Sequence, residues 1–436
     1  VLAHEFQHMI HWHLDSNEDA WLNEGASELA EELNGFDWPQ NAVRQFEKAP
    51  DLQLNTWSEG PAQVGAHYGA SYLMLRYLTK RFGPEALRAL AQCPANGIAS
   101  FDAILAQQGS GITFDELFAD WLVANALDAP SPGGGRYDHP GIDVSILART
   151  QVLDYPYTYN GDVGQYAADY LELYPSTVGT LRIVFAGSPE TKLIPNKARS
   201  GRFQWWSNRG DASHSYLEKS FGLTGVSTAT LSFNLWYDLE EGWDYAYVRA
   251  STDGGASWQF LRGNHMIDAN PTGSALSAGY TGKSAISNGG QDQTEAQWVK
   301  EALNLGAFCG QPVLLRFDYV TDDVLTKPGL CLDDLAIDEI GFYDDVESGE
   351  NGWHAEGFIR HDNRLPQRYI VQLVEFGDSL SVRQLPVHVN GWGQADIEGF
   401  GGQVEHALLI ISAIAPVTTE RANYRVQLEY LPQAGD

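Results

Sequence analysis

The feature that most constrains this chain is a pair of histidines four positions apart at its start. Residues 1–10 place His4 and His8 one helical turn apart, and Glu5 directly follows the first histidine. On an α-helix, side chains at positions i and i+4 project from one face, so both imidazoles can bind one metal ion. A carboxylate beside such an ion can take the proton of an attacking water. The segment therefore predicts a helical zinc site with Glu5 as the general base.

A catalytic zinc ion usually has three protein ligands, so a third ligand is expected. A third histidine of the metzincin kind would require glycine at position 11 and histidine at position 14. Those positions hold His11 and Leu14. Residues 21–32 offer Glu24 instead, from a second predicted helix that follows His8 closely. We therefore expect zinc to be bound by His4, His8 and Glu24.

The two segments together resemble the gluzincin family of zinc peptidases. The resemblance is carried by the His4-Glu5 motif and by Trp21-Leu22-Asn23-Glu24-Gly25, and these paired motifs are specific. It implies the same three zinc ligands and Glu5 as catalytic base. The spacing from His8 to Glu24 is shorter than in other gluzincins, so the connecting loop is expected to be tight.

The resemblance also assigns a role to Glu28, one helical turn after Glu24. In gluzincins an acid at this offset can hydrogen-bond the far nitrogen of a zinc histidine and fix its orientation. A solvated acidic helix face that includes Glu31 and Glu32 explains the same residue types equally well. Glu28 is therefore a candidate partner of a zinc histidine.

A further catalytic candidate is Tyr68. Gluzincins commonly stabilise the oxyanion with a tyrosine or histidine that follows the third ligand, which here indicates Tyr68 or, less favourably, His67. The competing interpretation is plain core packing, because Tyr72, Leu73 and neighbouring residues form an apolar helical stripe. Both interpretations stay open at this point.

Charge and composition limit the possible partners. The chain has 57 acidic against 27 basic residues and a formal charge of −30. This balance argues against nucleic acid and anionic membrane surfaces as partners.

The longest apolar run, around residues 407–417, is too short for a transmembrane segment. Of the three cysteines, Cys309 and Cys331 lie in one β-rich region, but their spacing leaves pairing open.

Residues 1–128 have the pattern of a helical region. Thr113-Phe114-Asp115-Glu116 is a capping box, and Gly83-Pro84 is expected to end one helix and begin the next. We expect this region to be the helical C-terminal half of a zincin catalytic domain. Because the chain begins without methionine and inside the metal helix, it is expected to be a fragment or a processed product.

The rest of the chain predicts β-structure. Residues 129–150 contain a proline- and glycine-rich stretch that predicts a linker. Short alternating segments separated by turns then predict antiparallel β-sandwich or jelly-roll domains, so the fold class is multidomain α+β. We expect residues 151–200 and 346–433 to pair into one sandwich, with residues 201–345 inserted as a jelly-roll module. Strands near Ile183 and Leu409 in separate sheets would contradict this arrangement.

The inserted segment has its own resemblance. Phe203-Gln204-Trp205-Trp206-Ser207, residues 236–248, and Leu332-Asp333-Asp334 resemble the jelly-roll module of immune inhibitor A-type secreted metallopeptidases, which is related to the MAM domain. The similarity extends to residues 365–369. The zinc helix of that family is of the metzincin type, so the catalytic motif of this chain departs from it. We expect a gluzincin-like helical part joined to an immune inhibitor A-like C-terminal region.

Two groups in this module are candidate binding residues. Carboxylates at expected strand ends suit calcium, although water-exposed acids in turns explain them equally well. They are Glu241, Asp244, Asp333 and Asp334.

Aromatic residues in the same module can stack sugars, but core packing is the safer interpretation for residues in strands. Residues 251–258 fit an Asp-box hairpin and are expected to be a structural turn in which Asp253 bonds its own backbone. The aromatic candidates are Trp205, Trp206, Trp236 and Trp243.

These features predict a secreted zinc-dependent metallopeptidase that acts on protein or peptide substrates. Endopeptidase action is preferred because a secreted enzyme with adhesive β-modules suits large substrates, and those modules also allow contact with glycans or cell surfaces. The alternative is a non-catalytic adhesion or carbohydrate-binding protein with an inactive peptidase remnant. The intact set of His4, Glu5, His8 and Glu24 argues against this alternative.

Overall fold

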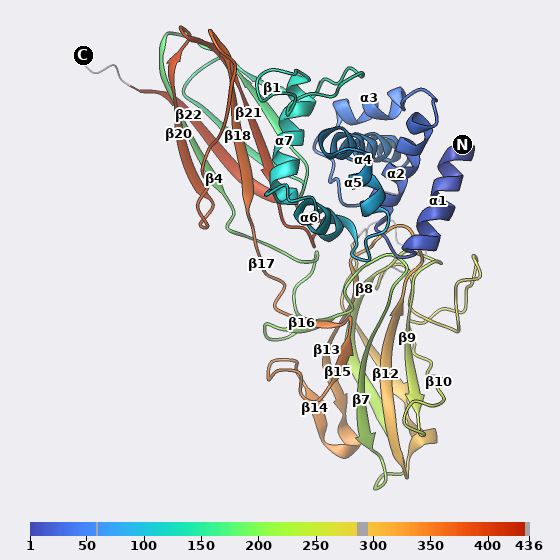
Figure 1. The fold of residues 1–436 in the computed structure, drawn as a ribbon. Helices are drawn as coiled ribbons and strands as arrows, with labels where there is room; N and C mark the ends of the chain where they lie inside the picture. Colours follow the sequence, from blue (N-terminus) through green and yellow to red (C-terminus); the bar gives the residue numbers. More distant parts are fainter. Residues whose placement is uncertain (58–59, 286–294, 432–436) are drawn as a thin grey trace. The chain divides into compact units, whose positions relative to one another are not determined.

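The N-terminal region is helical, as the sequence predicts, and the remainder is rich in β-strands (Figure 1). The computed structural model describes residues 1–57, 60–285 and 295–431. The chain divides into two compact units, Val1–Leu193 with Leu365–Asp436, and Ile194–Arg364. The helices found in the described residues are α1 (Leu2–Leu14), α2 (Ala20–Leu33), α3 (Gln40–Lys48), α4 (Pro61–Phe82), α5 (Pro84–Leu90), α6 (Gly97–Gln107) and α7 (Phe114–Leu127).

Helix α4 is the centre of the helical part. Residues 69–78 of α4 are all buried, which is typical of a helix packed on every side. Helices α2 and α3 pack against it, and its apolar side chains belong to a core shared with α6 and α7. Tyr72 lies in this core, as the apolar stripe in the sequence indicates, although its hydroxyl donates a hydrogen bond to Glu32.

The helix boundaries follow local sequence signals. Helix α4 ends at Phe82 and is followed by Gly83, whose φ of 84° favours glycine, and α5 begins directly at Pro84. At the start of α7, Thr113 Oγ1 accepts the backbone N–H of Glu116, while Glu116 Oε2 accepts the N–H of Thr113. The predicted capping box is therefore confirmed.

Strands from both sides of residues 194–364 build one nine-stranded sheet. Ile183 in β4 and Leu409 in β21 both lie in this sheet, whose main path runs β1-β3-β21-β20-β4-β22-β2, with β18 paired to β21 and β19. Its strands are β1 (Thr150–Val152), β2 (Tyr157–Val163), β3 (Asp169–Leu173), β4 (Gly179–Gly187), β18 (Tyr369–Gly377), β19 (Ser381–Gln384), β20 (Trp392–Phe400), β21 (Val404–Ala413) and β22 (Ala422–Tyr430).

Strand β21 explains the longest apolar run of the sequence. Leu408 and Ile410 pack into the core of the helical part, whereas Leu409 and Ile411 pack into the core formed by the sheet itself. Because successive side chains of a strand point to opposite faces, a strand buried on both faces is apolar throughout. Gln372 Nε2 also donates to the backbone oxygen of Ala119 in α7, and the helices and the sheet therefore form one unit.

Residues 129–149 connect α7 to β1 without a helix or strand, and some of their side chains are buried although many others are exposed. His139, Val144 and Ile146 are buried, and His139 Nε2 lies 2.9 Å from Asn125 Oδ1. The proline and glycine residues of this segment predict an irregular connection. They do not predict that side chains after them are buried.

The unit Ile194–Arg364 consists of two antiparallel sheets around one apolar core, to which Leu217 and Phe317 contribute from one sheet and Phe233 and Leu332 from the other. One sheet contains β7 (His214–Gly222), β9 (Tyr245–Ser251), β10 (Gln259–Phe260), β12 (Pro312–Val320) and β15 (His354–Glu356). The other contains β6 (Gln204–Trp206), β8 (Thr230–Asp238), β11 (Val299–Asn304), β13 (Gly329–Ile337), β14 (Phe342–Asp344) and β16 (Ile359–His361). This unit also contains two short 3₁₀ turns, η1 (Gly306–Phe308) and η2 (Asp338–Ile340). In the first unit, β5 (Glu190–Thr191) pairs with β17 (Leu365–Pro366).

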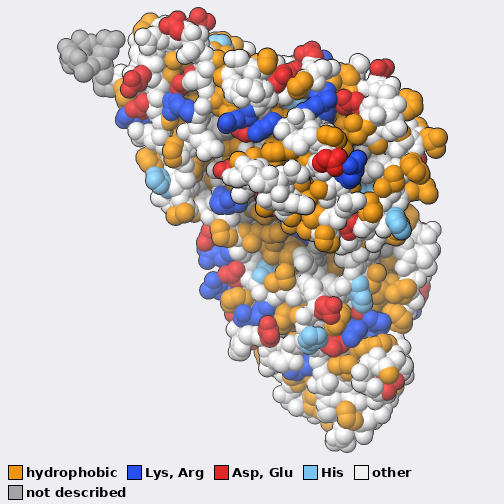
Figure 2. All heavy atoms as spheres, viewed as in Figure 1, with side chains coloured by type: hydrophobic (Ala, Val, Ile, Leu, Met, Phe, Trp, Pro, Cys, Tyr) orange, Lys and Arg blue, Asp and Glu red, His pale blue; other side chains and the backbone are white. Residues whose placement is uncertain are grey.

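Acidic and basic side chains are interspersed on the face shown in Figure 2, and apolar side chains such as Phe6 and Met9 of α1 reach the surface. Cys93, Cys309 and Cys331 are all free thiols. Among the described helices, none combines the length and the apolar character needed to cross a bilayer.

Candidate metal centre

Helices α1 and α2 form a hairpin that brings the two predicted metal-binding segments together. The five residues between the helices include Glu18, which is 6% exposed. Its Oε1 accepts the backbone N–H groups of Asp19 and Gly97, each at 2.7 Å. Burial raises the pKa of Glu18 to about 8. This short, anchored turn sends α2 back along α1, so that Glu24 faces the two histidines.

The three predicted zinc ligands converge. Glu24 Oε2 lies 3.4 Å from His4 Nε2 and 3.6 Å from His8 Nε2. Donor atoms bound tetrahedrally to one zinc ion at about 2.0–2.1 Å lie roughly 3.3–3.5 Å from one another. One donor atom from each of the three residues lies within 4.8 Å of the others. The donor types and their spacing therefore fit a zinc ion.

Glu24 Oε2 is also chemically unsatisfied. It is buried and accepts no hydrogen bond from the described residues. A buried carboxylate oxygen that accepts no hydrogen bond is costly, because the loss of its hydration is not compensated at that atom. A cation between Glu24 and the two imidazoles removes this cost.

Polar neighbours orient the ring of His8. Its Nδ1 lies 3.1 Å from Asn23 Oδ1 and 3.2 Å from Ser27 Oγ. The amide oxygen of Asn23 can only accept, so this contact places the proton on Nδ1 and leaves the lone pair of Nε2 free for a metal. Asn23 and Ser27 lie four positions apart on the face of α2 that meets His8.

Neither Asn23 nor Ser27 has a predicted role in the sequence. The available signal was the position of Asn23 directly before Glu24, together with Ser27 one helical turn later. Sequence alone, however, does not show which ring nitrogen either side chain meets.

Glu28 contacts the ring of His4. Its Oε1 lies 3.2 Å from His4 Nδ1, and the His4 and His8 rings meet edge to face with centroids 4.8 Å apart. Burial raises the pKa of Glu28, while its charge contact with His4 acts in the opposite direction. Glu28 thus occupies the position expected of a histidine partner, and both imidazoles present Nε2 to Glu24.

Tyr68 lies on the same site from α4. Its ring centroid is 6.2 Å from that of His4. Burial, followed by the charge and hydrogen bond of Glu24, raises the pKa of Tyr68 well above its ordinary value of 10. The hydroxyl is therefore a neutral hydrogen-bond donor. Close packing brings it there: a Cβ on Gly25 of α2 would stand 2.9 Å from the backbone of Ser71, so only glycine permits this approach of α2 to α4.

His67, the other oxyanion candidate, is turned into the protein. It is 2% exposed, its ring packs on Trp57 at 5.3 Å, and burial lowers its pKa to about 4. Trp57 also meets Tyr68 edge to face at 5.0 Å. His67 therefore supports the wall behind Tyr68, and Tyr68 is the member of the pair that meets the metal ligands.

Glu5 is exposed on the open side of the hairpin. The hydrogen bond of Glu24 raises the pKa of His8 most and burial raises that of Tyr68 most, and the negative charge of Glu5 adds a smaller increase to both pKa values. Glu32 accepts hydrogen bonds from Tyr72 and Arg76 of α4. Glu32 is thus engaged away from the metal ligands, while Glu5 is accessible to water.

The carboxylates predicted for calcium are not all brought together. Within the described residues, the grouping that could hold a cation in the second unit is Glu240, Asp244 and Asp322, named here the acidic cluster. Strand β12 pairs with β9 so that Val320 faces Tyr245, and this register brings Asp322 beside Asp244. Glu241, the neighbour of Glu240, is exposed.

Asp333 and Asp334 belong to a separate hydrogen-bond network on β13. Asp333 Oδ2 accepts the backbone N–H of Ser200, and Asp334 Oδ1 accepts the hydroxyl groups of Ser200 and Tyr343. Asn234 Nδ2 donates to Asp334 Oδ2. Burial raises the pKa of Asp333 to about 7. The sequence could not separate these two acids from Asp244, because strand pairing over long distances decides which strand ends meet.

The other predicted features of this unit are structural. Trp205, Trp206 and Trp236 are almost fully buried, whereas Trp243 is 45% exposed. The hydroxyl of Ser257 donates to Asp253 Oδ2 and its backbone N–H donates to Asp253 Oδ1, and these hydrogen bonds lower the pKa of Asp253 to about 2. The Asp-box segment is thus a self-bonded turn, and three of the four tryptophans pack in the interior.

Residues 183–363 match the family model "Immune inhibitor A-like, MAM domain". The matched residues contain nearly all of the unit Ile194–Arg364 and none of the zinc-ligand candidates. The chain is 32% identical over 176 residues to the pre-pro-metalloprotease PrtV of Vibrio cholerae, with 40% of this chain and 17% of the relative covered. It is 29% identical over 196 residues to immune inhibitor A of Bacillus thuringiensis, with 44% of this chain and 26% of the relative covered.

Bacillopeptidase F of Bacillus subtilis is 24% identical over 159 residues, 35% of this chain and 9% of that protein. The chain therefore spans about a quarter or less of the length of these relatives. Among solved structures, a mutant VP2 protein of infectious bursal disease virus aligns with 10% identity over 65% of this chain and 67% of that chain. Its TM-score of 0.15 supports no statement about the fold.

Proposed function

We propose that this chain carries the zinc site of a secreted metallopeptidase that cleaves peptide bonds within protein substrates. The observation that supports this most is the buried, unbonded Glu24 Oε2 between the Nε2 atoms of His4 and His8. Two histidines and one glutamate are a ligand set of catalytic zinc, which leaves a fourth position for water. The contacts of Asn23, Ser27 and Glu28 with the outer ring nitrogens support the same assignment.

When bound there, zinc supplies a Lewis acid that polarises the substrate carbonyl and lowers the pKa of water to about 7. Glu5 accepts the proton of the attacking water and passes it to the leaving amine, which is the role its exposed position beside His4 suits. Tyr68 keeps its proton because its pKa is raised, and its hydroxyl donates a hydrogen bond to the oxygen that becomes negative.

The names of two similar proteins support protein substrates. The Vibrio cholerae relative is called a metalloprotease, and the Bacillus subtilis relative is called a peptidase. We propose that the unit Ile194–Arg364 accompanies the catalytic part and brings it to large substrates, with glycan or cell-surface contact as a further use of this unit. Export from the cell and endopeptidase action belong to the same proposal.

Calcium is the second proposed metal. We place it at the acidic cluster, because Glu240, Asp244 and Asp322 each offer an oxygen within 4.8 Å of the others. Hard oxygen ligands of this kind suit calcium rather than zinc. In this proposal the calcium ion stabilises the second unit and takes no part in peptide hydrolysis.

The main competing function is a non-catalytic adhesion or carbohydrate-binding protein. Its supporting observation is that the family match covers the β-rich unit and not the metal hairpin. The two functions differ in one measurable property, because an inactive remnant releases no peptides from casein in the presence of zinc.

The decisive experiment compares Glu5→Gln with the unchanged chain in casein hydrolysis and in bound zinc. Glu5→Gln keeps the shape of the side chain but removes the proton acceptor, so hydrolysis falls by at least about a hundredfold while one zinc ion per chain is retained. Glu85→Gln, on the exposed surface of α5, is the matched control and keeps full activity. Equal activity of Glu5→Gln and the unchanged chain would refute the assignment of the base.

A further inference from the structure

The connection between α3 and α4 is bound to the nine-stranded sheet of the first unit. The backbone N–H of Leu54 donates to the oxygen of Tyr166, and the N–H of Ala168 donates to the oxygen of Pro50, each at 3.1 Å. Both of these partners lie between β2 and β3, and Leu54 is 1% exposed. Loops of this kind usually run free over the surface, whereas this one is fixed along its backbone.

A second set of hydrogen bonds comes from the segment between β21 and β22. Gln53 Nε2 donates to the backbone oxygen of Thr418 at 3.0 Å and to Asn55 Oδ1 at 2.9 Å. Asn55 Nδ2 in turn donates to the backbone oxygen of Pro416 at 2.9 Å. These bonds hold the part of the connection that directly precedes Trp57.

Trp57 joins this anchored connection to the metal centre. Its ring meets that of Tyr68 edge to face, with centroids 5.0 Å apart and an interplanar angle of 89°. It also packs on His67 at 5.3 Å, while Tyr68 lies 6.2 Å from the ring of His4. An edge-to-face pair restricts the orientation of both rings. Trp57 therefore limits where the hydroxyl of Tyr68 points.

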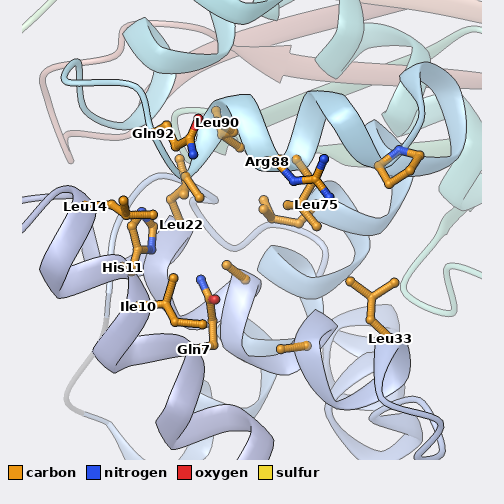
Figure 3. Close-up of a pocket in the computed structure, with 15 residues that line it drawn as sticks. Gln7, Ile10, His11, Leu14, Leu22, Leu33, Leu75, Arg88, Leu90 and Gln92 are labelled. Atoms are coloured by element: carbon orange, nitrogen blue, oxygen red, sulfur yellow. The ribbon is translucent and has the colours of Figure 1, made fainter.

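The other end of the helices gives Tyr68 no comparable support. There α1, α2, α4 and α5 border a groove of about 390 Å³ (Figure 3). Helix α4 contributes Leu75, two helical turns after Tyr68, and α2 contributes Leu22. The described residues that line this groove include neither Trp57 nor Tyr68. The position of Tyr68 thus depends on packing toward the start of α4.

We propose that Trp57 is a positioning residue that holds Tyr68 toward the metal centre, and that the nine-stranded sheet holds Trp57 in place through Gln53 and Asn55. The inference rests on the proposed peptidase function, in which Tyr68 donates to the oxyanion. Such a donor is effective only when it is aimed at the position that the charged oxygen will occupy. Fixing Tyr68 therefore affects the transition state and has little effect on substrate binding.

A double-mutant cycle on the zinc-loaded chain tests the role of Trp57. With fluorescently labelled casein as the substrate, Tyr68→Phe lowers kcat about a hundredfold and Trp57→Ala about tenfold, while KM changes by less than about twofold. In the Tyr68→Phe chain, the added Trp57→Ala causes no further loss, because no hydroxyl is left to misplace. All variants bind zinc as the unchanged chain does.

Matched variants separate the ring from general packing. Trp57→Phe keeps an aromatic ring against Tyr68 and retains at least about a third of kcat. Trp392→Phe, at a position on β20 that is 42% exposed, is the control and leaves kcat unchanged. Should Trp57→Ala not fold by circular dichroism, Trp57→Leu replaces it in the cycle, since leucine is apolar but has no ring.

The role of the sheet is tested separately. Asn55→Ala removes the hydrogen bond to Pro416 and one partner of Gln53. It lowers kcat about three- to tenfold, and it has no effect in the Tyr68→Phe chain. Asn160→Ala, on the exposed surface of β2, is the control and keeps full kcat.

The results that overturn the inference differ from those that overturn the proposed function. In an active chain, equal losses from Trp57→Ala with and without the Tyr68 hydroxyl reject the positioning role while the proposed function stands. Full kcat in Asn55→Ala rejects the role of the sheet. An unchanged chain that releases no peptides from casein in the presence of zinc rejects the proposed function, and the inference with it.

Discussion

The metal hairpin of α1 and α2 and the acidic cluster of the second unit both gather three metal-binding side chains, yet they differ in how those side chains are satisfied. At the hairpin, Glu24 Oε2 is buried and accepts no hydrogen bond from the described residues, while Asn23, Ser27 and Glu28 contact the outer nitrogens of His8 and His4. In the acidic cluster, both oxygens of Asp244 already accept hydrogen bonds, from Tyr319 and from the backbone of Asp322.

This difference separates a site that needs an ion from one that can be stable without it. At the hairpin, contacts at the outer nitrogens fix the orientation of the rings and leave the inner nitrogens for a ligand. This arrangement is typical of histidines that bind a metal. A buried carboxylate with two hydrogen bonds is also stable as a structural element, particularly because burial raises the pKa of Asp244 to about 7 and so favours the neutral form. We expect tight zinc binding at the hairpin and weaker cation binding at the acidic cluster.

The largest predicted effect tests the hairpin. Glu24→Ala removes one of three protein ligands, and the affinity for zinc is expected to fall about a hundred- to a thousandfold, since a structural zinc site gains on the order of 10–16 kcal/mol from four ligands. Competition with a chromogenic chelator measures this. Glu241→Ala, an exposed acid in the second unit, keeps the affinity of the unchanged chain. Unaltered zinc affinity in Glu24→Ala would remove this residue from the ligand set.

A smaller effect is expected for the residues that orient the rings. Asn23→Ala leaves the three ligands in place but frees the ring of His8, so zinc affinity falls about ten- to a hundredfold. Ser27→Ala has a weaker effect, because Asn23 still accepts the Nδ1 proton. The same chelator competition ranks the two variants, and a larger loss in Ser27→Ala than in Asn23→Ala contradicts the assigned proton position.

The turn of the hairpin predicts a pH-dependent stability. The pKa of Glu18 is raised to about 8 in the folded chain from an ordinary 4.5, so the folded state holds a proton that the unfolded state has lost between these values. Stability from this group is present below pH 4.5 and is lost as the pH rises to about 8.

Glu18→Gln keeps the acceptor oxygen for Asp19 and Gly97 but cannot ionise. It is expected to stabilise the chain by about 1–2 kcal/mol at pH 8.5 and by almost nothing at pH 4.5, measured by urea unfolding. Glu405→Gln, on an exposed end of β21, is the control and shows no such dependence. Equal stabilisation at both pH values contradicts a raised pKa of Glu18.

The hairpin also shows what the sequence can and cannot predict. The helical N-terminal region and the β-rich remainder were predictable, because helix signals such as the Thr113 capping box and strand alternation are local patterns. The convergence of His4, His8 and Glu24 was open to prediction for the same reason, since it requires only helical periodicity and a short turn. Their role in binding zinc remains a proposal.

The acidic cluster was harder to predict, because it depends on contacts that are distant in the sequence. Asp322 reaches Asp244 only through the pairing of β12 with β9, and no periodic pattern encodes that register. Glu240 and Glu241 are adjacent acids, and strand geometry rather than residue type decides which of the two joins Asp244. The same limit applies to the groove beside α5, whose lining residues come from four helices.

The smallest predicted effect tests the acidic cluster. Calcium sites of extracellular modules have dissociation constants of about 10⁻⁴–10⁻³ M, so 2 mM calcium is expected to stabilise the second unit by about 0.6–1.8 kcal/mol. Urea unfolding followed with and without calcium measures this. Asp244→Asn removes the charge at the centre of the cluster and abolishes the gain, whereas Asp334→Asn, in the separate network of Ser200 and Tyr343, retains it. If calcium stabilises Asp244→Asn as strongly as the unchanged chain, the ion binds elsewhere. In that case the hydrogen bonds of Asp244 have only a structural role, and the two sites differ in kind rather than in strength.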